Sequence, residues 1–282
     1  MSSTGSFHPT GVSDVAAADS AVVGASLLPR SDPVLKVNAL SVVYASSRGP
    51  IKAVADLTLS LHQGEFVSVL GPSGCGKSTL LGVLAGLQVA TKGSAAVFDR
   101  PMMGRPHPNV GVVFQRPTLL PWLSVLDNIL IPIEAMRRRK SDYLDRAHEL
   151  LRLVALEKYA SHYPAELSGG MQQRVGLARA MIHSPGLILM DEPFAALDAM
   201  TRERMSVELQ EILRESGQSV LFITHSIPEA VFLSDRVLMM SASPGRIIKD
   251  VAIDLPRPRV TATMAQSEFA EICGALRKLY IQ

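Results

Sequence analysis

Two segments near the start of the chain alternate apolar and polar residues. They are residues 35–44 (LKVNALSVVY) and residues 54–65 (VADLTLSLHQGE). An alternation with a period of two is typical of strands that bury one face and expose the other. The pattern therefore predicts an antiparallel β layer in the N-terminal part of the chain.

Three shorter segments are apolar without alternation. Residues 66–70 (FVSVL), 187–191 (LILMD) and 220–224 (VLFIT) each lie next to a segment with helical periodicity. Short continuous apolar runs of this kind are typical of parallel strands that are covered on both faces. They predict an α/β core with a mainly parallel sheet. Ligands collect at the carboxyl ends of such strands, so we expect functional side chains there.

A long helical stretch separates the first of these strands from the other two. Between about 116 and 170 no strand pattern interrupts the helical one. One apolar stripe is formed by Leu144, Ala147, Leu151 and Val154. The spacing predicts a helical subdomain that is inserted between the core strands.

The segment 203–217 predicts another amphipathic helix. Gly217 is its expected stop, because glycine readily adopts the conformation that ends a helix. Its inward-facing residues are expected to be Met205, Leu209, Ile212 and Leu213.

These elements divide the chain into three parts. Residues 1–33 are rich in Ser, Ala and Gly and predict a disordered N-terminal extension. The extension lacks a basic n-region, and Asp14 and Asp19 interrupt its apolar stretch, so a secretory signal is not expected. Residues 34–255 are expected to form one domain, and residues 256–282 a C-terminal helical tail.

Composition narrows the classes of function. The formal net charge is +2, from 28 basic against 26 acidic residues, so no strong field predicts a nucleic-acid partner. The two cysteines, Cys75 and Cys273, cannot build a disulfide framework, which suits a reducing cytoplasm. No run of about 18 apolar residues is present, so a membrane role requires a partner.

A phosphate-binding motif follows the apolar run at 66–70. The sequence GPSGCGKST fits the pattern G-x-x-x-x-G-K-[ST], with a predicted strand before it and a helix after it. Backbone amides of such a turn wrap the α- and β-phosphates, Lys77 reaches the β- and γ-phosphates, and the Ser78 hydroxyl ligates Mg²⁺. The predicted nucleotide-binding residues of this motif are Gly71, Pro72, Ser73, Gly74, Cys75, Gly76, Lys77, Ser78 and Thr79.

Polar side chains end the other apolar runs. Alternation along a strand aims Asp191 and Glu192 in different directions, so we expect different roles. Asp191 fits a Mg²⁺ ligand, and Glu192 fits the general base that polarises the attacking water. His225 follows the last of the three runs, where it either contacts the γ-phosphate or is a structural histidine. Gln115 ends a further apolar run and is a candidate to complete the Mg²⁺ and water shell.

A second anion site is predicted at Ser168, Gly169 and Gly170. A helix is expected to begin there, because apolar residues then recur on one face at Met171, Val175, Ala178 and Met181. The first backbone amides of a helix converge, the serine adds a hydroxyl, and the helix dipole favours negative charge. The chain thus has two predicted phosphate sites that lie far apart in the sequence.

Together these residues resemble the ATP-binding cassette (ABC) ATPases over about residues 35–250. LSGGMQQR (167–174) resembles the signature of that family, GPSGCGKST its Walker A motif, and LILMDEP its Walker B motif with catalytic Glu192. By the same resemblance Gln115 is the Q-loop glutamine and His225 the switch histidine. The D-loop would be formed by Ala196, Leu197 and Asp198. The resemblance implies a P-loop ATPase core with ATP and Mg²⁺ as cofactors.

Two aromatic residues have roles that the resemblance suggests and the sequence leaves open. Tyr44 lies where the family places an aromatic side chain against adenine, and its alternative is an ordinary strand aromatic. Trp122 lies in the segment 115–122, where the family docks integral-membrane permease subunits. Its alternative is burial in the helical subdomain.

The resemblance also implies how two phosphate sites are used. In the family two cassettes pack head to tail, so that the 168–170 turn of one chain closes on the γ-phosphate held by the other. The implied partners are a second copy of the chain, permease subunits and, indirectly, a periplasmic solute-binding protein. The chain is accordingly expected at the cytoplasmic face of the inner membrane, where the permease holds it.

Local runs resemble one importer group most. LLPWLSVLDNI, THSIPEAVFLSDRVLMMS and the PGRI and LPRPR stretches are similar to ATPase subunits of bacterial importers for nitrate, sulfonate, taurine or bicarbonate. Ala195, Ser226 and Pro228 depart from that group, but none is an expected phosphate contact. The alternatives are a soluble cassette ATPase of translation or DNA repair and a non-hydrolysing nucleotide-gated module. Intact Glu192 and His225 argue against the latter.

Overall fold

The computed structural model describes residues 1, 32–47, 49–195 and 197–281. Most of the expected N-terminal extension, and Ala196 of the predicted D-loop, lie outside the described residues. None of the helices in the described part of the chain is both long enough and apolar enough to cross a membrane.

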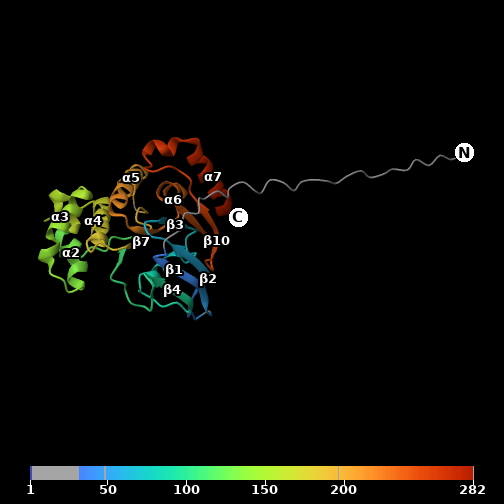
Figure 1. Ribbon diagram of the computed structural model, residues 1–282, viewed down its shortest axis with the longest axis horizontal. Coiled ribbons are helices and arrows are strands. Elements are labelled where there is room, and N and C mark those ends of the chain that lie inside the picture. Colours follow the sequence, from blue (N-terminus) through green and yellow to red (C-terminus); the bar gives the residue numbers. More distant parts are fainter. Residues whose placement is uncertain (2–31, 48, 196, 282) are drawn as a thin grey trace.

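An antiparallel sheet forms the lower layer in Figure 1, with the strand order β2-β1-β4-β5. Its strands are β1 (Leu35–Tyr44), β2 (Ile51–Leu61), β4 (Lys92–Val97) and β5 (Arg100–Pro101). The prediction for β1 is confirmed residue for residue. The second predicted strand, 54–65, is misplaced, because β2 starts earlier and the chain turns after Leu61.

A second sheet forms the core, in the order β10-β9-β3-β8-β7-β6. Its strands are β3 (Phe66–Leu70), β6 (Val110–Val113), β7 (Leu187–Asp191), β8 (Ser219–Thr224), β9 (Arg236–Met240) and β10 (Ile247–Ala252). The pairs β3–β8, β3–β9, β7–β8 and β6–β7 are parallel, and only the edge strand β10 runs antiparallel to its neighbour within this described sheet. The three continuous apolar runs are therefore the parallel strands that the sequence predicts.

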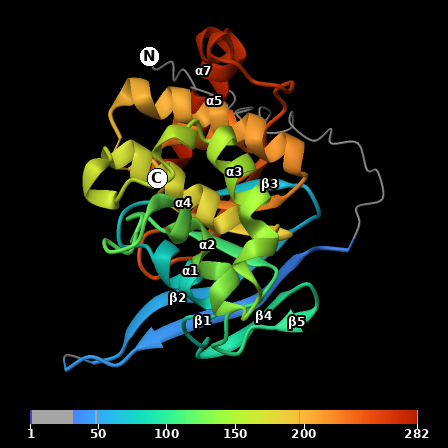
Figure 2. The ribbon, with the colours of Figure 1, turned by 90° about the vertical axis from the view of Figure 1, so that its left-hand side faces the viewer.

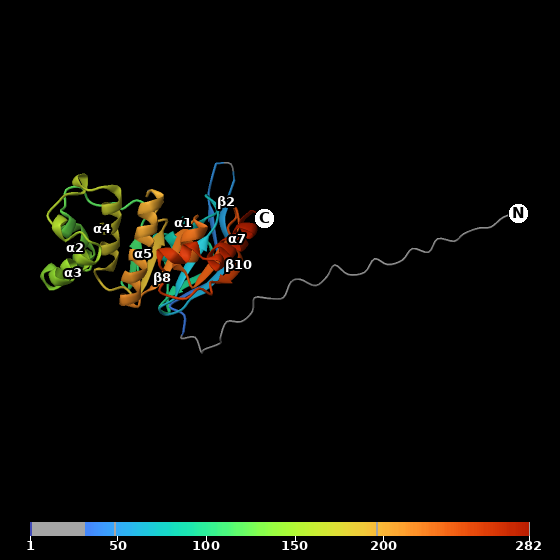
Figure 3. The same cartoon turned by 90° about the horizontal axis from the view of Figure 1, so that it is seen from above.

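Helices cover the sheets and extend beyond them. They are α1 (Lys77–Leu84), α2 (Val125–Ala135), α3 (Leu144–Leu153), α4 (Gly169–Met181), α5 (Ala199–Ser216), α6 (Ile227–Leu233) and α7 (Ser267–Ile281). Short 3₁₀ turns occur at Lys140–Tyr143, Glu157–Tyr159, Pro164–Glu166 and Thr261–Ala265. Helices α2, α3 and α4 stand together at one end of the molecule, away from β1 and β2 (Figures 1 and 3). The predicted fold, an α/β core with an antiparallel layer and an inserted helical part, is confirmed.

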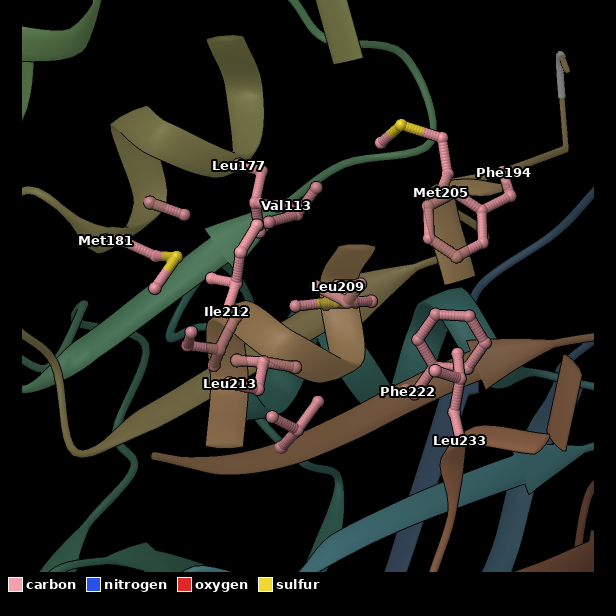
Figure 4. Close-up of a cluster of buried hydrophobic side chains, with 14 of the residues drawn as sticks. Val113, Leu177, Met181, Phe194, Met205, Leu209, Ile212, Leu213, Phe222 and Leu233 are labelled. Atoms are coloured by element: carbon pink, nitrogen blue, oxygen red, sulfur yellow. The ribbon is translucent and has the colours of Figure 1, made fainter. Parts of the chain in front are cut away.

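The parallel sheet buries apolar side chains on both of its faces. On one face Val69 and Leu221 pack with Leu80 of α1 and with the antiparallel sheet, which lies below α1 in Figure 2. On the other face Phe222 packs with helices α4, α5 and α6. Figure 4 shows part of this second cluster, with Leu209 of α5 lying between α4 and β8. The sheet is thus fixed on both sides, which holds the carboxyl ends of its strands in place.

The structure confirms the predicted buried face of α5 and corrects the predicted buried face of α3. In α5 the predicted inward residues are all buried, and Gly217 ends the helix in the left-handed conformation at φ 63°. In α3 the predicted stripe is wrong at its first member. Leu144 begins the helix and is 39% exposed, whereas Leu150 completes the buried face together with Ala147 and Leu151.

A buried arginine joins the C-terminal segment to α6. The side chain of Arg259 is 1% exposed. Its guanidinium donates hydrogen bonds to backbone carbonyls of Val231 (2.8 Å), Phe232 (3.0 Å), Ser234 (2.7 Å), Ile253 (3.4 Å) and Leu255 (3.1 Å). The last carbonyls of a helix have no partner within it, so Arg259 caps the C-terminal end of α6.

Candidate active site

The loop between β3 and α1 has a backbone that requires glycine. Gly74 and Gly76 have φ values of 77° and 101°, which L side chains rarely adopt. A Cβ on Gly76 would also lie 2.6 Å from the Ala53 carbonyl oxygen. The predicted phosphate loop, residues 71–79 (the P-loop), therefore has the tight turn at a helix N-terminus that phosphate binding needs.

Lys77 lies in the centre of this loop. Its ammonium donates hydrogen bonds to the carbonyl oxygens of Gly71 (2.8 Å) and Pro72 (2.9 Å). The side chain is 5% exposed, and Nζ lies 3.7 Å from Oε1 of Glu192. A shielded cation therefore lies where the loop would hold phosphates, and next to the candidate general base.

The two adjacent carboxylates at the end of β7 have different partners. Burial raises the pKa of Asp191 above its ordinary value, and the nearby Ser78 hydroxyl opposes this shift. Glu192 instead lies beside Lys77 and accepts a hydrogen bond at Oε2 from His225 Nδ1, at 2.9 Å, if that nitrogen carries the proton. Hydroxyl and carboxylate oxygens are the ligands that Mg²⁺ prefers, so Ser78 and Asp191 fit a Mg²⁺ site.

Glu192 is held in an unusual backbone conformation. Its φ is 43°, in the left-handed region that a residue with a side chain adopts only at a cost of about 1–3 kcal/mol. The backbone N–H of Glu192 donates a hydrogen bond to the Ile223 carbonyl on β8 at 2.8 Å. This bond brings the end of β7 to β8, so that Glu192 and His225 face each other.

Tyr44 and Gln115 lie at the ends of β1 and β6. The Tyr44 hydroxyl donates to Oε1 of Gln88 at 2.8 Å and lies 3.2 Å from the Thr79 hydroxyl, and the residue is 42% exposed. Its hydroxyl is thus next to the P-loop helix, and the residue is partly open to solvent. Gln115 is exposed and follows β6 by two residues.

The predicted second anion site, residues 168–170, is the N-terminus of α4. The Ser168 hydroxyl accepts a hydrogen bond from the backbone N–H of Met171 at 3.3 Å. A Cβ on Gly169 would meet open space, and one on Gly170 would contact Leu197 at 3.5 Å. No hydrogen bond among the described residues joins this turn to the P-loop of the same chain.

The segment after Gln115 borders a groove of about 640 Å³. Its lining includes Phe114, Thr118, Pro132, Met136, Arg179 and His183. Trp122 is 70% exposed, so its alternative role as a buried residue of the helical part is wrong. Gln173 and Arg179, which were not predicted as site residues, donate hydrogen bonds to backbone carbonyls of Phe114, Pro117 and Thr118. They lie six residues apart, about 120° around the helix axis, so no regular helical spacing singles them out.

A glycine-rich phosphate loop at the end of a parallel strand, next to an acidic pair and a histidine, defines an ATPase of the P-loop class. The family model described as ABC transporter matches residues 54–195. The chain belongs to the ABC transporter family, is an ABC-type ATPase and binds ATP.

Relatives and a solved structure agree with this assignment. An uncharacterized ABC transporter ATP-binding protein of Methanocaldococcus jannaschii is 44% identical over 225 residues, which cover 80% of this chain and 84% of the relative. A taurine import ATP-binding protein of Burkholderia thailandensis is 46% identical over 218 residues, which cover 77% and 84% of the two chains. The dimeric structure of an ATP-binding cassette bound to ADP and Pi is similar with a TM-score of 0.69 and 31% identity, covering 79% of this chain and 100% of that one.

Proposed function

We propose that this chain is the ATP-hydrolysing subunit of a bacterial importer. ATP binding and hydrolysis in a head-to-tail cassette dimer would drive the uptake of a small anion or organosulfur compound, such as nitrate, sulfonate, taurine or bicarbonate. A relative that is named for taurine import supports this group of solutes. In this proposal permease subunits hold the chain at the cytoplasmic face of the inner membrane.

The proposed ATP site uses the residues around the P-loop. Its amides and Lys77 bind the phosphates, and the partly exposed Tyr44 stacks on the adenine ring. Ser78, Asp191 and Gln115 are the proposed Mg²⁺ ligands, directly or through water. The bound ion would neutralise phosphate charge as the terminal phosphate leaves.

The contacts of Glu192 are the observation that carries the proposal of hydrolysis. Its two carboxylate oxygens lie 3.7 Å from Lys77 Nζ and 2.9 Å from His225 Nδ1. Glu192 can therefore accept a proton from a water that attacks the γ-phosphate, while Lys77 holds that phosphate. His225 would fix the orientation of the carboxylate.

The exposure of the 168–170 turn supports the head-to-tail dimer. The 168–170 turn presents its amides to solvent, and a second chain could bring its own P-loop to them. A phosphate held between the two chains loses its contact with bulk water, which strengthens the interactions that stabilise the transition state. ATP would then hold the dimer together, and hydrolysis would release it.

Size-exclusion chromatography with ATP tests the dimer. Glu192→Gln is expected to bind ATP, to hydrolyse it about 10²- to 10⁴-fold more slowly and to accumulate as an ATP-bound dimer. Adding Ser168→Arg is expected to restore the monomer, because it places bulk where the turn would meet the γ-phosphate. A monomeric Glu192→Gln protein, or a dimeric double variant, would show that the turn has no role in trans.

The groove beside Gln115 and the exposed Trp122 are the proposed permease contact. A periplasmic solute-binding protein would act indirectly, through the permease. Co-expression with the membrane proteins encoded by neighbouring genes tests this partner. Recovery in the membrane fraction is expected. If the chain stays wholly in the soluble fraction, the importer proposal fails and a soluble cassette ATPase takes its place.

A further inference from the structure

A basic segment follows α2, at the end of the molecule that α2, α3 and α4 form (Figures 1 and 3). Residues 137–139 are three exposed arginines, called the arginine cluster below. The next residue, Lys140, pairs with Glu134 at 2.8 Å, whereas none of the three arginines forms an ion pair with a described residue. Residues 134–142 hold four basic and two acidic side chains, a net charge of +2 that equals the net charge of the whole chain. The remainder of the chain is formally neutral, so the excess positive charge is local.

The first arginine of the cluster occupies a position that favours glycine. Arg137 has a φ of 57°, in the left-handed region. The backbone N–H groups of Arg137 and Arg138 donate to the carbonyls of Glu134 (2.9 Å) and Ile133 (3.0 Å), which is the pair of bonds that ends a helix at a left-handed residue. An arginine in this conformation costs stability that a glycine would not. The chain thus keeps a positive side chain where its backbone disfavours one.

The arginine cluster borders the groove that the proposed function assigns to the permease. Met136, directly before the cluster, lines the groove. Burial lowers the pKa of His183, another lining residue, and the charge of Arg138 lowers it further. Burial and the charge of Arg100 act in the same way on His107, which also lines the groove. None of the described lining residues is acidic, so positive charge predominates around the groove.

The end of α2 does not by itself account for three arginines. The helix dipole favours cations only within the last turn. Arg138 donates from Nη1 to the Tyr143 hydroxyl at 2.7 Å, and this neutral partner leaves its charge uncompensated. Arg139 comes after the last turn and does not cap the 3₁₀ turn that follows it. The charges are therefore available to a partner outside the chain.

We propose that the arginine cluster binds the anionic phospholipid headgroups around the permease. This inference rests on the proposed function, because a chain whose groove is filled by an integral-membrane protein turns that face to the bilayer. The cytoplasmic leaflet carries a negative surface potential. A guanidinium can donate two parallel hydrogen bonds to one phosphate, which a lysine ammonium does not match. Three exposed arginines at the rim of the groove therefore fit a surface of phosphate groups.

Screening by salt determines how the cluster acts. At physiological ionic strength the attraction between exposed charges extends over about 8 Å. The cluster therefore strengthens the attachment of a chain that the permease already holds. It does not recruit a free chain from solution, which agrees with a net charge of only +2.

Vesicle flotation tests the cluster without the permease. The probes are vesicles of phosphatidylcholine alone and of equal parts phosphatidylcholine and phosphatidylglycerol, at about 10 mM salt, where screening extends to about 30 Å. The wild-type chain is expected to float with the anionic vesicles only. Each arginine near an anionic surface raises the partition coefficient about fivefold, so the triple variant Arg137→Gln, Arg138→Gln, Arg139→Gln is expected to lower it about 10²-fold.

A matched control removes three positive charges elsewhere. Arg214, Arg277 and Lys278 are exposed on α5 and α7, and none of them lines the groove. Replacing all three by glutamine changes the net charge equally and is expected to lower binding by about twofold or less, because these charges lie outside the contact.

Arg137→Gly separates lipid binding from stability. It is expected to raise the urea midpoint of unfolding, because glycine adopts the left-handed conformation freely, and to lower the partition coefficient about fivefold. If Arg137 had only a structural role, the substitution would leave vesicle binding unchanged.

The remaining outcomes overturn the inference. They are no binding of the wild type to anionic vesicles, equal binding to neutral vesicles, and equal losses in the two triple variants. Retention on single-stranded RNA without binding to anionic vesicles would assign the cluster to nucleic acid and overturn it too. Should the triple variant of the cluster fail to fold, Arg137→Gly and Arg139→Gln decide: weaker binding in either supports the inference, and unchanged binding in both overturns it.

Failure of this inference is distinguishable from failure of the proposed function. If the chain is recovered with the permease but does not bind anionic vesicles, the inference is overturned and the proposed function stands. If the chain binds the vesicles but is never recovered with the permease, the proposed function fails, and the placement of the lipids around a permease fails with it.

Discussion

Replacing Arg259 by methionine tests how the C-terminal segment holds α6. The guanidinium donates six hydrogen bonds to five backbone carbonyls. Methionine has a similar reach and keeps apolar contacts, but it has no donor. In Arg259→Met the five carbonyls therefore lose this partner, and two of them belong to the last turn of α6.

The expected effect is large. A hydrogen bond to a charged group contributes about 1.5–3 kcal/mol to stability. Three of the six bonds are short, at 2.7, 2.8 and 3.0 Å, and the size of the expected loss is taken from these three. The loss is smaller than their sum, because the variant no longer buries a cation whose desolvation lowers the pKa of Arg259 to about 10. We expect the free energy of unfolding to fall by about 3–5 kcal/mol, as for other broken buried charge contacts.

Urea unfolding followed by circular dichroism measures this loss. A lower midpoint at unchanged slope reports a change in stability. Arg246→Met is the matched control, because Arg246 is 54% exposed and its ion pair with Asp56, at 3.9 Å, contributes at most about 1 kcal/mol. If Arg259→Met is no less stable than Arg246→Met, the carbonyl cap does not hold α6 and the reasoning is refuted.

Three further predictions concern function. Lys77→Ala is expected to fold but to lose ATP hydrolysis in a phosphate-release assay by about 10²- to 10³-fold or more, since the phosphates lose a shielded cation; near-normal turnover would contradict the P-loop assignment. Chelation of divalent cations by EDTA is expected to stop hydrolysis and added Mg²⁺ to restore it, whereas turnover that persists in EDTA would remove the proposed role of Ser78 and Asp191. Trp122→Ala is expected to stay folded, because Trp122 is 70% exposed. It is expected to weaken the binding free energy for permease subunits by about 2–4 kcal/mol, which reduces co-purification. Unchanged recovery would place the contact elsewhere.

The sequence predicts the strands whose side chains follow one clear pattern. β1 alternates and β3 is continuously apolar, and both were predicted with their observed ends. β4 (KGSAAV) and β10 (IIKDVA) were not predicted, because small or charged residues interrupt their patterns. β4 pairs with β1, and β10 pairs with β9, through backbone hydrogen bonds. Such pairing produces no side-chain pattern within the strand itself, so the sequence does not predict it.

The sequence likewise predicts some of the functional and structural residues, whereas others are found only from the structure. The P-loop is contiguous in the sequence, and the strand before it and the helix after it identify it. Arg179 and Arg259 donate hydrogen bonds to backbone carbonyls. The side chains of the accepting residues have no feature that would identify those carbonyls. The composition of a segment does not reveal which of its carbonyls lack a partner, so these two arginines could be found only from the structure.

The outward-facing 168–170 turn has a genetic consequence. A chain with Lys77→Ala keeps an intact turn, and a chain with Ser168→Arg keeps an intact P-loop. A dimer made of either variant alone would have both of its ATP sites damaged. In a mixed dimer both lesions fall on the same site, and the other site combines the healthy half of each chain. Two inactive alleles are therefore expected to complement each other when they are expressed together, with one working site in each mixed dimer.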